Sequence, residues 1–161
     1  MDSIDLRLIR YLQKQPDVPL TELSRRLGMP KTTCWNRLQR LEESGVIAGK
    51  YIKFDRDELG LSVVVFLSIT VGRHSPEWVN KFTTVVNQFP EIVEAHRLTG
   101  EGADYQLKIV CPDIDAYDAF QQKLINEIDF TSMSSKISMK EMKSTHLLPL
   151  SHLQKDSEEK S

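Results

Sequence analysis

The sequence contains no hydrophobic run long enough to cross a membrane, and its longest uninterrupted apolar stretch is Val63–Leu67. A membrane-spanning helix needs about 20 apolar residues. The first ten residues, MDSIDLRLIR, carry acidic side chains where a signal peptide has a basic flank and an apolar run. We therefore expect a cytoplasmic protein with no membrane partner.

Cysteine is also scarce, since Cys34 and Cys111 are the two in the sequence. Two widely separated cysteines are weak support for a disulfide in a cytoplasmic protein. No CxxC or HExxH spacing occurs, and the four histidines are scattered along the chain. The sequence thus predicts no metal site and no cofactor.

The net charge of −2 at pH 7 by itself disfavours nucleic-acid binding, but the charges are unevenly distributed. Residues 18–53 contain seven Lys and Arg against three acids, which is a local charge of +4. Residues 61–161 contain ten Lys and Arg against fourteen acids, which is a local charge of −4. A basic module joined to an acidic one is typical of a DNA-binding regulator.

Three helices are predicted near the N-terminus from the spacing of apolar residues, at about 3–15, 20–27 and 31–44. Gly28 and Pro30 form a tight turn between the second helix and the third. An extended stretch follows the third helix and is predicted to form a strand pair. Together these elements indicate a winged helix-turn-helix.

The second half of the chain alternates between β-branched runs and helical spacing. The predicted elements are strands at 62–71, 92–98, 105–110 and 132–142, and helices at 78–88 and 113–128. The order β-α-β-β-α-β indicates a ferredoxin-like domain, in which two helices cover one face of a four-stranded antiparallel sheet. The open face and edges of such a sheet commonly pair with another copy.

The fold class is therefore α+β, with two domains. The predicted organisation is a winged helix-turn-helix domain at 1–53, a linker at 54–61, a ferredoxin-like domain at 62–150 and a disordered tail at 151–161.

Cys34 lies in the cationic segment of the third helix, where it is either a core residue or a reactive thiol. Cys34, Leu38 and Leu41 recur at steps of four and three, which places them on one inward stripe. A buried cysteine behaves as a small hydrophobic residue. The alternative is a redox-active thiol, because Lys31 and the helix N-terminus lie nearby.

The polar residues of the third helix fall on its other sides and are of the types that read DNA. Arg pairs with guanine, Asn pairs with adenine, and the N-terminal residues of such a helix reach the bases. A plain solvated helix face is the alternative. The predicted DNA-binding residues are Lys31, Thr32, Thr33 and Asn36 for bases, Arg37 and Arg40 for bases or phosphates, and Arg25, Arg26, Lys50 and Lys53 for phosphates.

Several segments together resemble one family. They are ID at 4–5, LxxLxxRLGM at 20–29, TTCWNRLQRLEESGVI at 32–47, DELGL at 57–61, TG at 99–100 and DY at 104–105. Over about residues 2–150 the chain resembles the Lrp/AsnC family of bacterial and archaeal transcription regulators. The form CWxRLxRLE is similar to the DecR/CyuR-like subgroup, which regulates cysteine detoxification.

This resemblance implies a C-terminal ligand-sensing (RAM) domain, homodimers formed through its sheet, assembly of dimers into octamers, and an amino-acid effector, with cysteine as the first candidate. The implied effector-binding residues are Thr99, Gly100, Glu101, Asp104 and Tyr105 in one loop, with Ser134 and Ser135 on the last strand. Glycine exposes backbone N–H groups that can hold a carboxylate, and Asp104 can accept from an α-ammonium group. Without the resemblance, the residues alone favour a simple hairpin turn in which Gly and Asp serve the backbone geometry.

The predicted function is a sequence-specific regulator that binds double-stranded DNA and responds to an amino acid. One alternative is an architectural protein of the same fold that wraps DNA in the nucleoid. A ferredoxin-like enzyme is a further alternative, but no nucleophile–base pair supports it. We therefore expect no catalytic residues.

Overall fold

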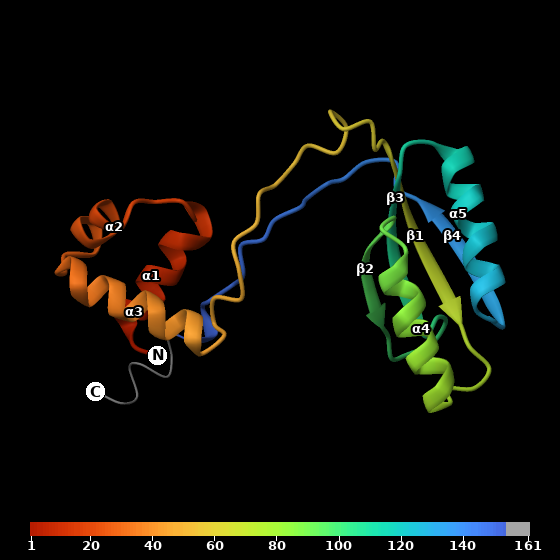
Figure 1. The fold of residues 1–161 in the computed structure, drawn as a ribbon, viewed down its shortest axis with the longest axis horizontal. Helices are drawn as coiled ribbons and strands as arrows, with labels where there is room; N and C mark the ends of the chain where they lie inside the picture. The colour runs from red at the N-terminus through yellow and green to blue at the C-terminus, as the bar shows by residue number, and fades with distance from the viewer. Residues whose placement is uncertain (154–161) are drawn as a thin grey trace. The chain divides into compact units, whose positions relative to one another are not determined.

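The computed structural model describes residues 1–153, which form two compact units. One unit comprises Met1–Ile52 together with the described residues from Lys143 onward, and the other comprises Lys53–Met142. Figure 1 labels the helices and strands of each unit. No helix of the described residues is both long and apolar enough to cross a membrane.

The first unit contains the three predicted helices, and their bounds agree with the sequence within one or two residues. They are α1 at Ser3–Lys14, α2 at Leu20–Leu27 and α3 at Lys31–Glu43. Asp2 caps α1 and forms a capping box with Asp5, in which each side chain accepts from the other residue's backbone N–H. Gly28 ends α2 with φ of 66°, a left-handed conformation that favours glycine.

The core of the first unit takes one apolar stripe from each helix. Leu8 of α1, Leu23 of α2, and Cys34 and Leu41 of α3 are buried together. Leu38 packs against this cluster from the side. The inward stripe predicted for the third helix is therefore confirmed, and the opposite side of α3 is left for solvent.

The strand pair predicted after the third helix is wrong for this chain, because no strand lies between α3 and β1 in the described residues. Ile47 is tied to α3, since its N–H donates to the Leu41 carbonyl at 3.0 Å. Beyond it, Tyr51, Ile52 and Phe54 are highly exposed. An extended segment becomes a strand only when it exchanges backbone hydrogen bonds with a second segment, and no such ladder forms here within the described residues.

The second unit has the predicted βαββαβ order. Its elements are β1 at Val63–Thr70, α4 at Pro76–Gln88, β2 at Ile92–Arg97, β3 at Tyr105–Cys111, α5 at Ile114–Glu127 and β4 at Ser132–Ile137. The sheet order is β2-β3-β1-β4, and all neighbouring strands are antiparallel. Ser75 and Asp113 cap the two helices through their side chains.

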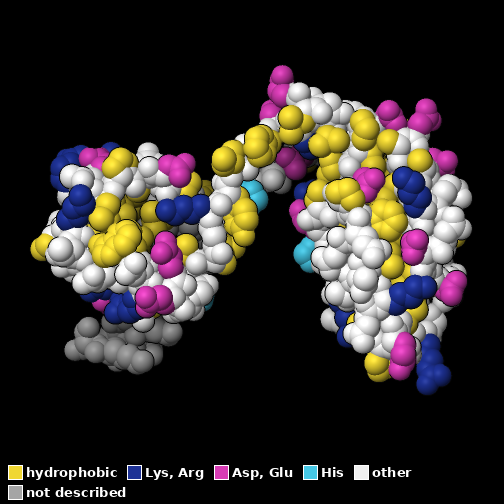
Figure 2. Space-filling model, viewed as in Figure 1, with side chains coloured by type: hydrophobic (Ala, Val, Ile, Leu, Met, Phe, Trp, Pro, Cys, Tyr) yellow, Lys and Arg dark blue, Asp and Glu magenta, His cyan; other side chains and the backbone are white. Residues whose placement is uncertain are grey.

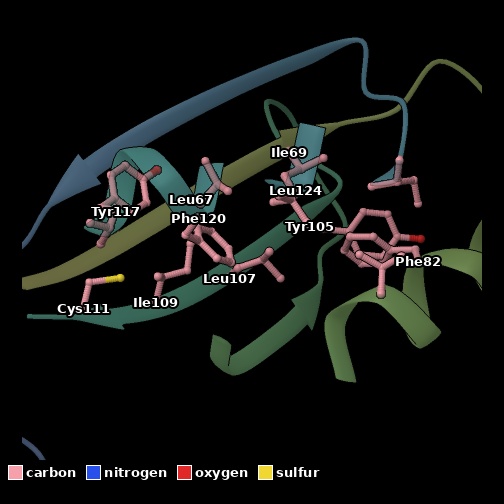
Figure 3. Close-up of a cluster of buried hydrophobic side chains, with 13 residues drawn as sticks. Leu67, Ile69, Phe82, Tyr105, Leu107, Ile109, Cys111, Tyr117, Phe120 and Leu124 are labelled. Atoms are coloured by element: carbon pink, nitrogen blue, oxygen red, sulfur yellow. The ribbon is translucent and has the colours of Figure 1, made fainter. Parts of the chain in front are cut away.

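Both helices cover the same face of the sheet. Alternate residues of β1 and β3 point into this layer, among them Leu67 and Leu107, and they meet Phe82 of α4 and Phe120 of α5 (Figure 3). The strands therefore show the period of two expected for a sheet with one buried face.

The last strand is shorter than the predicted 132–142 and ends at Ile137. Its partner β1 begins at Val63, and the last bond between them joins the Ser138 N–H to the Val64 carbonyl at 2.8 Å. Residues beyond this point have no strand to pair with. Met139 and Met142 are accordingly 93% and 86% exposed.

The chain after Lys143 belongs to the first unit, where Gln13 of α1 and the backbone of Leu148 exchange two hydrogen bonds. Ser151–Leu153 make a turn, in which the Leu153 N–H donates to the Leu150 carbonyl at 3.3 Å. The tail predicted at 151–161 begins at this turn, and residues 154–161 lie outside the described part of the chain.

Candidate nucleic-acid interface and effector site

The N-terminus of α3 is open to a ligand. Pro30 stands at the N-cap position, so no side chain satisfies the backbone N–H groups of the first turn. The first turn also contains no acidic residue. Unsatisfied N–H groups and the helix dipole make such an end favourable for phosphate oxygens. The observed start of α3 at Lys31, directly after Pro30, agrees with the helix predicted from residue 31.

The side of α3 that points away from the core carries the residues predicted to reach bases. Lys31, Thr32, Thr33 and Asn36 are all exposed. Gln39 is exposed as well, and the helical repeat puts it on the face of Thr32 and Asn36. The sequence analysis missed Gln39, although this repeat could have found it.

Cys34 belongs to the core and is 0% exposed. Burial raises the pKa of its thiol, which favours the protonated form. A reactive cysteine needs an accessible thiolate. This environment therefore favours the packing role over the redox alternative.

Arg37 does not point toward the exposed face. Its guanidinium donates to Asp2 and to Asp5 of α1, each at 2.7 Å, and its side chain is only 21% exposed. The Asp2 carboxylate, and after it that of Asp5, raises the pKa of Arg37. The helical repeat explains this position, because Arg37 lies about 60° from Cys34 around α3.

Arg40 lies one turn further along and pairs with the same carboxylate. Its guanidinium donates to Asp5 at 2.7 Å, but 60% of its side chain remains exposed. Asp5 itself is 0% exposed. We call the group of Asp2, Asp5, Arg37 and Arg40 the α1–α3 clasp. The sequence did not identify Asp2 and Asp5 as partners of the two arginines. Their three-residue spacing is that of a capping box, which does place both acids at the start of α1.

The predicted phosphate contacts on α2 are held by an acid of their own helix. Glu22 accepts from Arg25 at 2.8 Å and from Arg26 at 2.6 Å. Arg26, and after it Arg25, lowers the pKa of Glu22, which is therefore ionised at neutral pH. Arg26 also lies over the Tyr11 ring, 5.2 Å from its centroid. Both arginines remain at least half exposed, with 71% and 51% of their side chains accessible.

The two lysines predicted for the wing lie on the unpaired extended segment. Lys50 and Lys53 are both exposed. Lys50 belongs to the first unit, whereas Lys53 is the first residue of the second unit. The sequence prediction had placed both on one wing.

The loop from Thr99 to Tyr105 connects β2 to β3 and contains two strained glycines. Gly100 and Gly102 have φ of 126° and 106°, which favours glycine at both positions. Thr70 of β1 donates its hydroxyl to the Gly102 carbonyl at 3.1 Å. Thr99 and Glu101 are exposed at the rim of this loop.

Asp104 fixes the end of the loop. One carboxylate oxygen accepts from the Val71 N–H at 2.7 Å, and the other lies 3.7 Å from Nε2 of His74. Both side chains are about one-third exposed, with 31% for Asp104 and 30% for His74. Asp104 therefore uses one oxygen within the chain and keeps the second near solvent. His74 was not selected from the sequence.

Tyr105 points in the opposite direction, into the helix-covered core. Its ring packs against Phe82, with 4.6 Å between centroids (Figure 3). It also packs against Trp78, at 5.5 Å. It is 5% exposed, and its buried hydroxyl has no hydrogen-bond partner in the described chain. Tyr105 therefore anchors the end of the loop on the core.

The two serines predicted for the effector site lie on opposite faces of the sheet. Ser135 pairs with the buried Leu67, and its hydroxyl is 2.6 Å from that of Tyr117 on the helix side. Ser134 pairs with Ser68 and lies on the open face. The two serines therefore point to opposite faces of the sheet, because neighbouring strand residues alternate.

Comparison with known proteins decides the family. Residues 64–148 match the family model described as the Lrp/AsnC ligand binding domain, and residues 1–48 match the model described as winged helix-turn-helix DNA-binding. The chain belongs to the Lrp/AsnC family.

Curated Lrp/AsnC relatives match nearly the whole chain. The glutamate uptake regulatory protein of Zymomonas mobilis is 34% identical over 161 residues, covering 100% of this chain and 98% of that protein. The DNA-binding transcriptional activator DecR of Escherichia coli K12 is 34% identical over 151 residues, covering 93% of this chain and 99% of that protein.

Solved Lrp/AsnC-type structures confirm the fold. An AsnC family transcriptional regulator from Agrobacterium tumefaciens is 39% identical with a TM-score of 0.90, covering 95% of this chain and 99% of that chain. The regulator NMB0573 from Neisseria meningitidis, solved as a complex with L-Met, is 27% identical with a TM-score of 0.88 and has the same coverage.

The resemblance found from the sequence is therefore confirmed, and this Lrp/AsnC protein is a DNA-binding transcriptional regulator with a winged helix-turn-helix domain and a ligand-binding domain. The family is one of regulators rather than enzymes. The individual DNA and effector contacts are taken up below as proposals.

Proposed function

We propose that this Lrp/AsnC protein is a sequence-specific regulator that reads DNA with the N-terminal half of α3 and responds to an amino acid. The observation that carries the proposal is the combination of an uncapped helix N-terminus with an exposed polar face on the second helix of a helix-turn-helix. In such motifs the first residues of this helix lie deepest in the major groove.

We assign the DNA contacts according to exposure. Base contacts come from Lys31, Thr32, Thr33 and Asn36, which are exposed in the part of the chain that the structure describes. Arg40 contacts a phosphate, because most of its side chain is accessible beside Asp5. Phosphate contacts by Arg25, Arg26, Lys50 and Lys53 complete the set.

The structure changes the role proposed for Arg37. Its guanidinium would have to leave two carboxylates, one of them buried, before it could read a base. Asp5 would keep Arg40 and the Asp2 backbone N–H as partners, but it would lose one of the two guanidinium groups that compensate its buried charge, which is unfavourable. Arg37 therefore holds α3 in place on α1 and affects DNA binding through that position.

A binding-site selection from random duplexes tests the proposal. A two-fold dimer is expected to enrich a palindromic sequence with half-sites about 34 Å apart, or a multiple of this distance. A footprint on the enriched site then separates two functions. One discrete protected region supports a local regulator, whereas extended periodic protection supports the architectural DNA-wrapping protein.

The effector is proposed to bind at the Thr99–Tyr105 loop. Gly100 exposes backbone N–H groups suited to a carboxylate, and the Asp104 oxygen that faces His74 at 3.7 Å can accept from an α-ammonium. The NMB0573 complex supports an amino acid as the ligand class, since that protein was solved with L-Met. Cysteine stays our first candidate from the CWxRLxRLE resemblance, and methionine and glutamate are the competing candidates.

A thermal-shift screen of the twenty amino acids tests this site, because a ligand that binds only the folded state raises the unfolding temperature. The Asp104→Asn variant keeps an oxygen for the Val71 N–H but loses the negative charge. It is expected to weaken the effector about tenfold or more, since hydrogen bonds to charged groups contribute about 1.5–3 kcal/mol. If no amino acid stabilises the protein in this screen, the effector proposal is contradicted. The proposal of DNA binding is unaffected by that result.

The open face of the sheet is proposed as the dimer contact. It carries Phe66 beside a hollow of about 260 Å³, with the Glu94–Lys108 ion pair of 2.8 Å at its wall. A second copy of the chain covers this face, and dimers assemble further to octamers. Sedimentation of the full chain with and without effector measures both steps. A cytoplasmic location follows from the DNA target, and no enzymatic activity is expected.

A further inference from the structure

Trp35 is an exposed aromatic on a helix whose other apolar residues are buried or half-buried. It leaves 49% of its surface accessible, and within the described residues its ring has no aromatic partner and its indole N–H no acceptor. The other tryptophan behaves differently. Trp78 stacks on Phe82 with 4.9 Å between centroids and donates its indole N–H to the Asp129 carbonyl at 3.0 Å. Trp35 thus offers a large apolar surface without an aromatic or hydrogen-bonding partner among residues 1–153.

The position of Trp35 around α3 places it beside the proposed base-reading residues. It lies about 100° from Cys34, on the flank away from the clasp that ties Arg37 to α1. Its neighbours one turn before and after are Lys31 and Gln39, both exposed. Figure 2 shows exposed hydrophobic side chains on this unit with Lys and Arg side chains around them.

The charge along α3 limits what can meet this flank. The first turn has no acid, whereas Glu42 and Glu43 are exposed at the other end of the helix. Phosphates are therefore favoured at the N-terminus of α3, whereas Glu42 and Glu43 repel them at its last residues. Trp35 belongs to the half of α3 that a polyanion such as DNA can approach. The two glutamates at the C-terminal end disfavour an acidic protein surface there.

We propose that Trp35 is a specificity-determining residue that contacts the C5-methyl group of thymine in the major groove. Apolar side chains recognise thymine through this methyl group, which no other DNA base carries there. Lys31, Thr32 and Asn36 supply polar contacts on the same half of the helix, and the indole ring adds the apolar one. The inference rests on the proposed DNA reading by α3 and adds a base preference to it.

The test uses the full chain and the duplex enriched from a random pool. Each thymine of that duplex is replaced in turn by uracil, which removes only the methyl group. At one thymine per half-site, the replacement is expected to weaken binding of the parent protein about fourfold, the equivalent of one buried methyl group. The Trp35→Ala variant is expected to bind the thymine and uracil duplexes equally at that position, because the methyl contact is then already lost.

A fluorescence measurement gives an independent readout. In a Trp78→Phe variant, which keeps a ring beside Phe82, all tryptophan emission comes from position 35. Acrylamide quenching of this emission is expected to fall when the enriched duplex is added. Unchanged quenching on a bound duplex, or a uracil effect that persists in Trp35→Ala, would overturn the inference.

The two levels of the proposal fail in different ways. If the random pool yields no enriched sequence, sequence-specific reading by α3 is contradicted as a whole. If a sequence is enriched but every uracil replacement is neutral for the parent protein, the thymine contact alone is contradicted.

Discussion

Asp5 and Arg37 form an ion pair of 2.7 Å between α1 and α3, with the Asp5 carboxylate 1% exposed. The carboxylate also accepts from Arg40 at 2.7 Å and from the Asp2 backbone N–H at 3.1 Å. A nearly dry carboxylate is stable only when such partners surround it. The recognition helix is therefore oriented by a buried charge near the start of the chain, in addition to the apolar core.

The first prediction concerns the stability of the first unit. Asp5→Asn removes the charge that Arg37 and Arg40 share, and it is expected to lower the free energy of unfolding by about 3 kcal/mol, as for other broken buried pairs. Urea unfolding followed by circular dichroism measures this. Asp17→Asn, at an exposed turn residue, is the matched control and is expected to stay within about 0.5 kcal/mol of the parent. If Asp5→Asn is as stable as the control, the α1–α3 clasp does not stabilise the first unit.

The second prediction separates the two arginines of the clasp by the salt dependence of DNA binding. Each phosphate contact contributes about −0.9 to the slope of log affinity against log salt. Arg40→Gln is expected to reduce the steepness by about this amount, because Arg40 is accessible. Arg37→Gln is expected to weaken binding and lower stability while the slope is unchanged.

Titrations of the enriched duplex at several salt concentrations provide these slopes. A reduced slope for Arg37→Gln would show that Arg37 contacts phosphate after all. If Arg37→Gln instead relaxes the base preference at one position and leaves stability unchanged, Arg37 reads a base.

The third prediction concerns the acid that competes with DNA for Arg25 and Arg26. Glu22→Gln frees both guanidinium groups from a negative partner. DNA affinity at low salt is expected to rise several-fold, and the salt slope is expected to steepen, since more charge can meet phosphates. Glu58→Gln, in the other unit, removes the same charge elsewhere and serves as the control. A drop in affinity for Glu22→Gln would mean that the acid positions the arginines for DNA.

The fourth prediction concerns acid unfolding. The Asp5 backbone N–H, and after it the Arg37 guanidinium, lowers the pKa of Asp2 below its ordinary value of 3.8. A carboxyl group with a lowered pKa in the folded state stabilises the fold above its unfolded pKa, and this contribution is lost as pH falls through the folded value. Asp2→Asn keeps a helix-capping side chain but no charge.

The variant is therefore expected to be less stable than the parent at pH 7 and to approach it as pH falls below the lowered folded-state pKa of Asp2, where the carboxyl group is protonated in both states. Unfolding midpoints in urea across this range measure the convergence. A constant difference at all pH values would assign the effect to capping instead of charge.

Much of the local structure was predictable because it depends on neighbours along the chain. Pro16 and Gly28 mark helix ends through their own backbone chemistry, and steps of four and three identified Cys34 as a core residue. The loop at Gly100 was likewise found from its residue types. Each of these inferences needed information from only a few positions.

Other features required contacts between distant parts of the chain. Nothing within α3 reveals that Arg37 meets Asp5, which is 32 residues earlier in sequence. The length of β4 depends on where β1 begins, and an extended segment after α3 remains single without a partner strand.

The sequence by itself determined the family, the helices and their inward faces, because residue type and spacing act locally. Tertiary structure decided which of the charged side chains on these helices are accessible to a ligand. Arg37 and Arg40 are three residues apart on one helix, yet one is enclosed by two carboxylates and the other is 60% exposed. Their difference arises from where α1 packs against α3, since the position of a partner carboxylate sets whether a guanidinium can reach DNA.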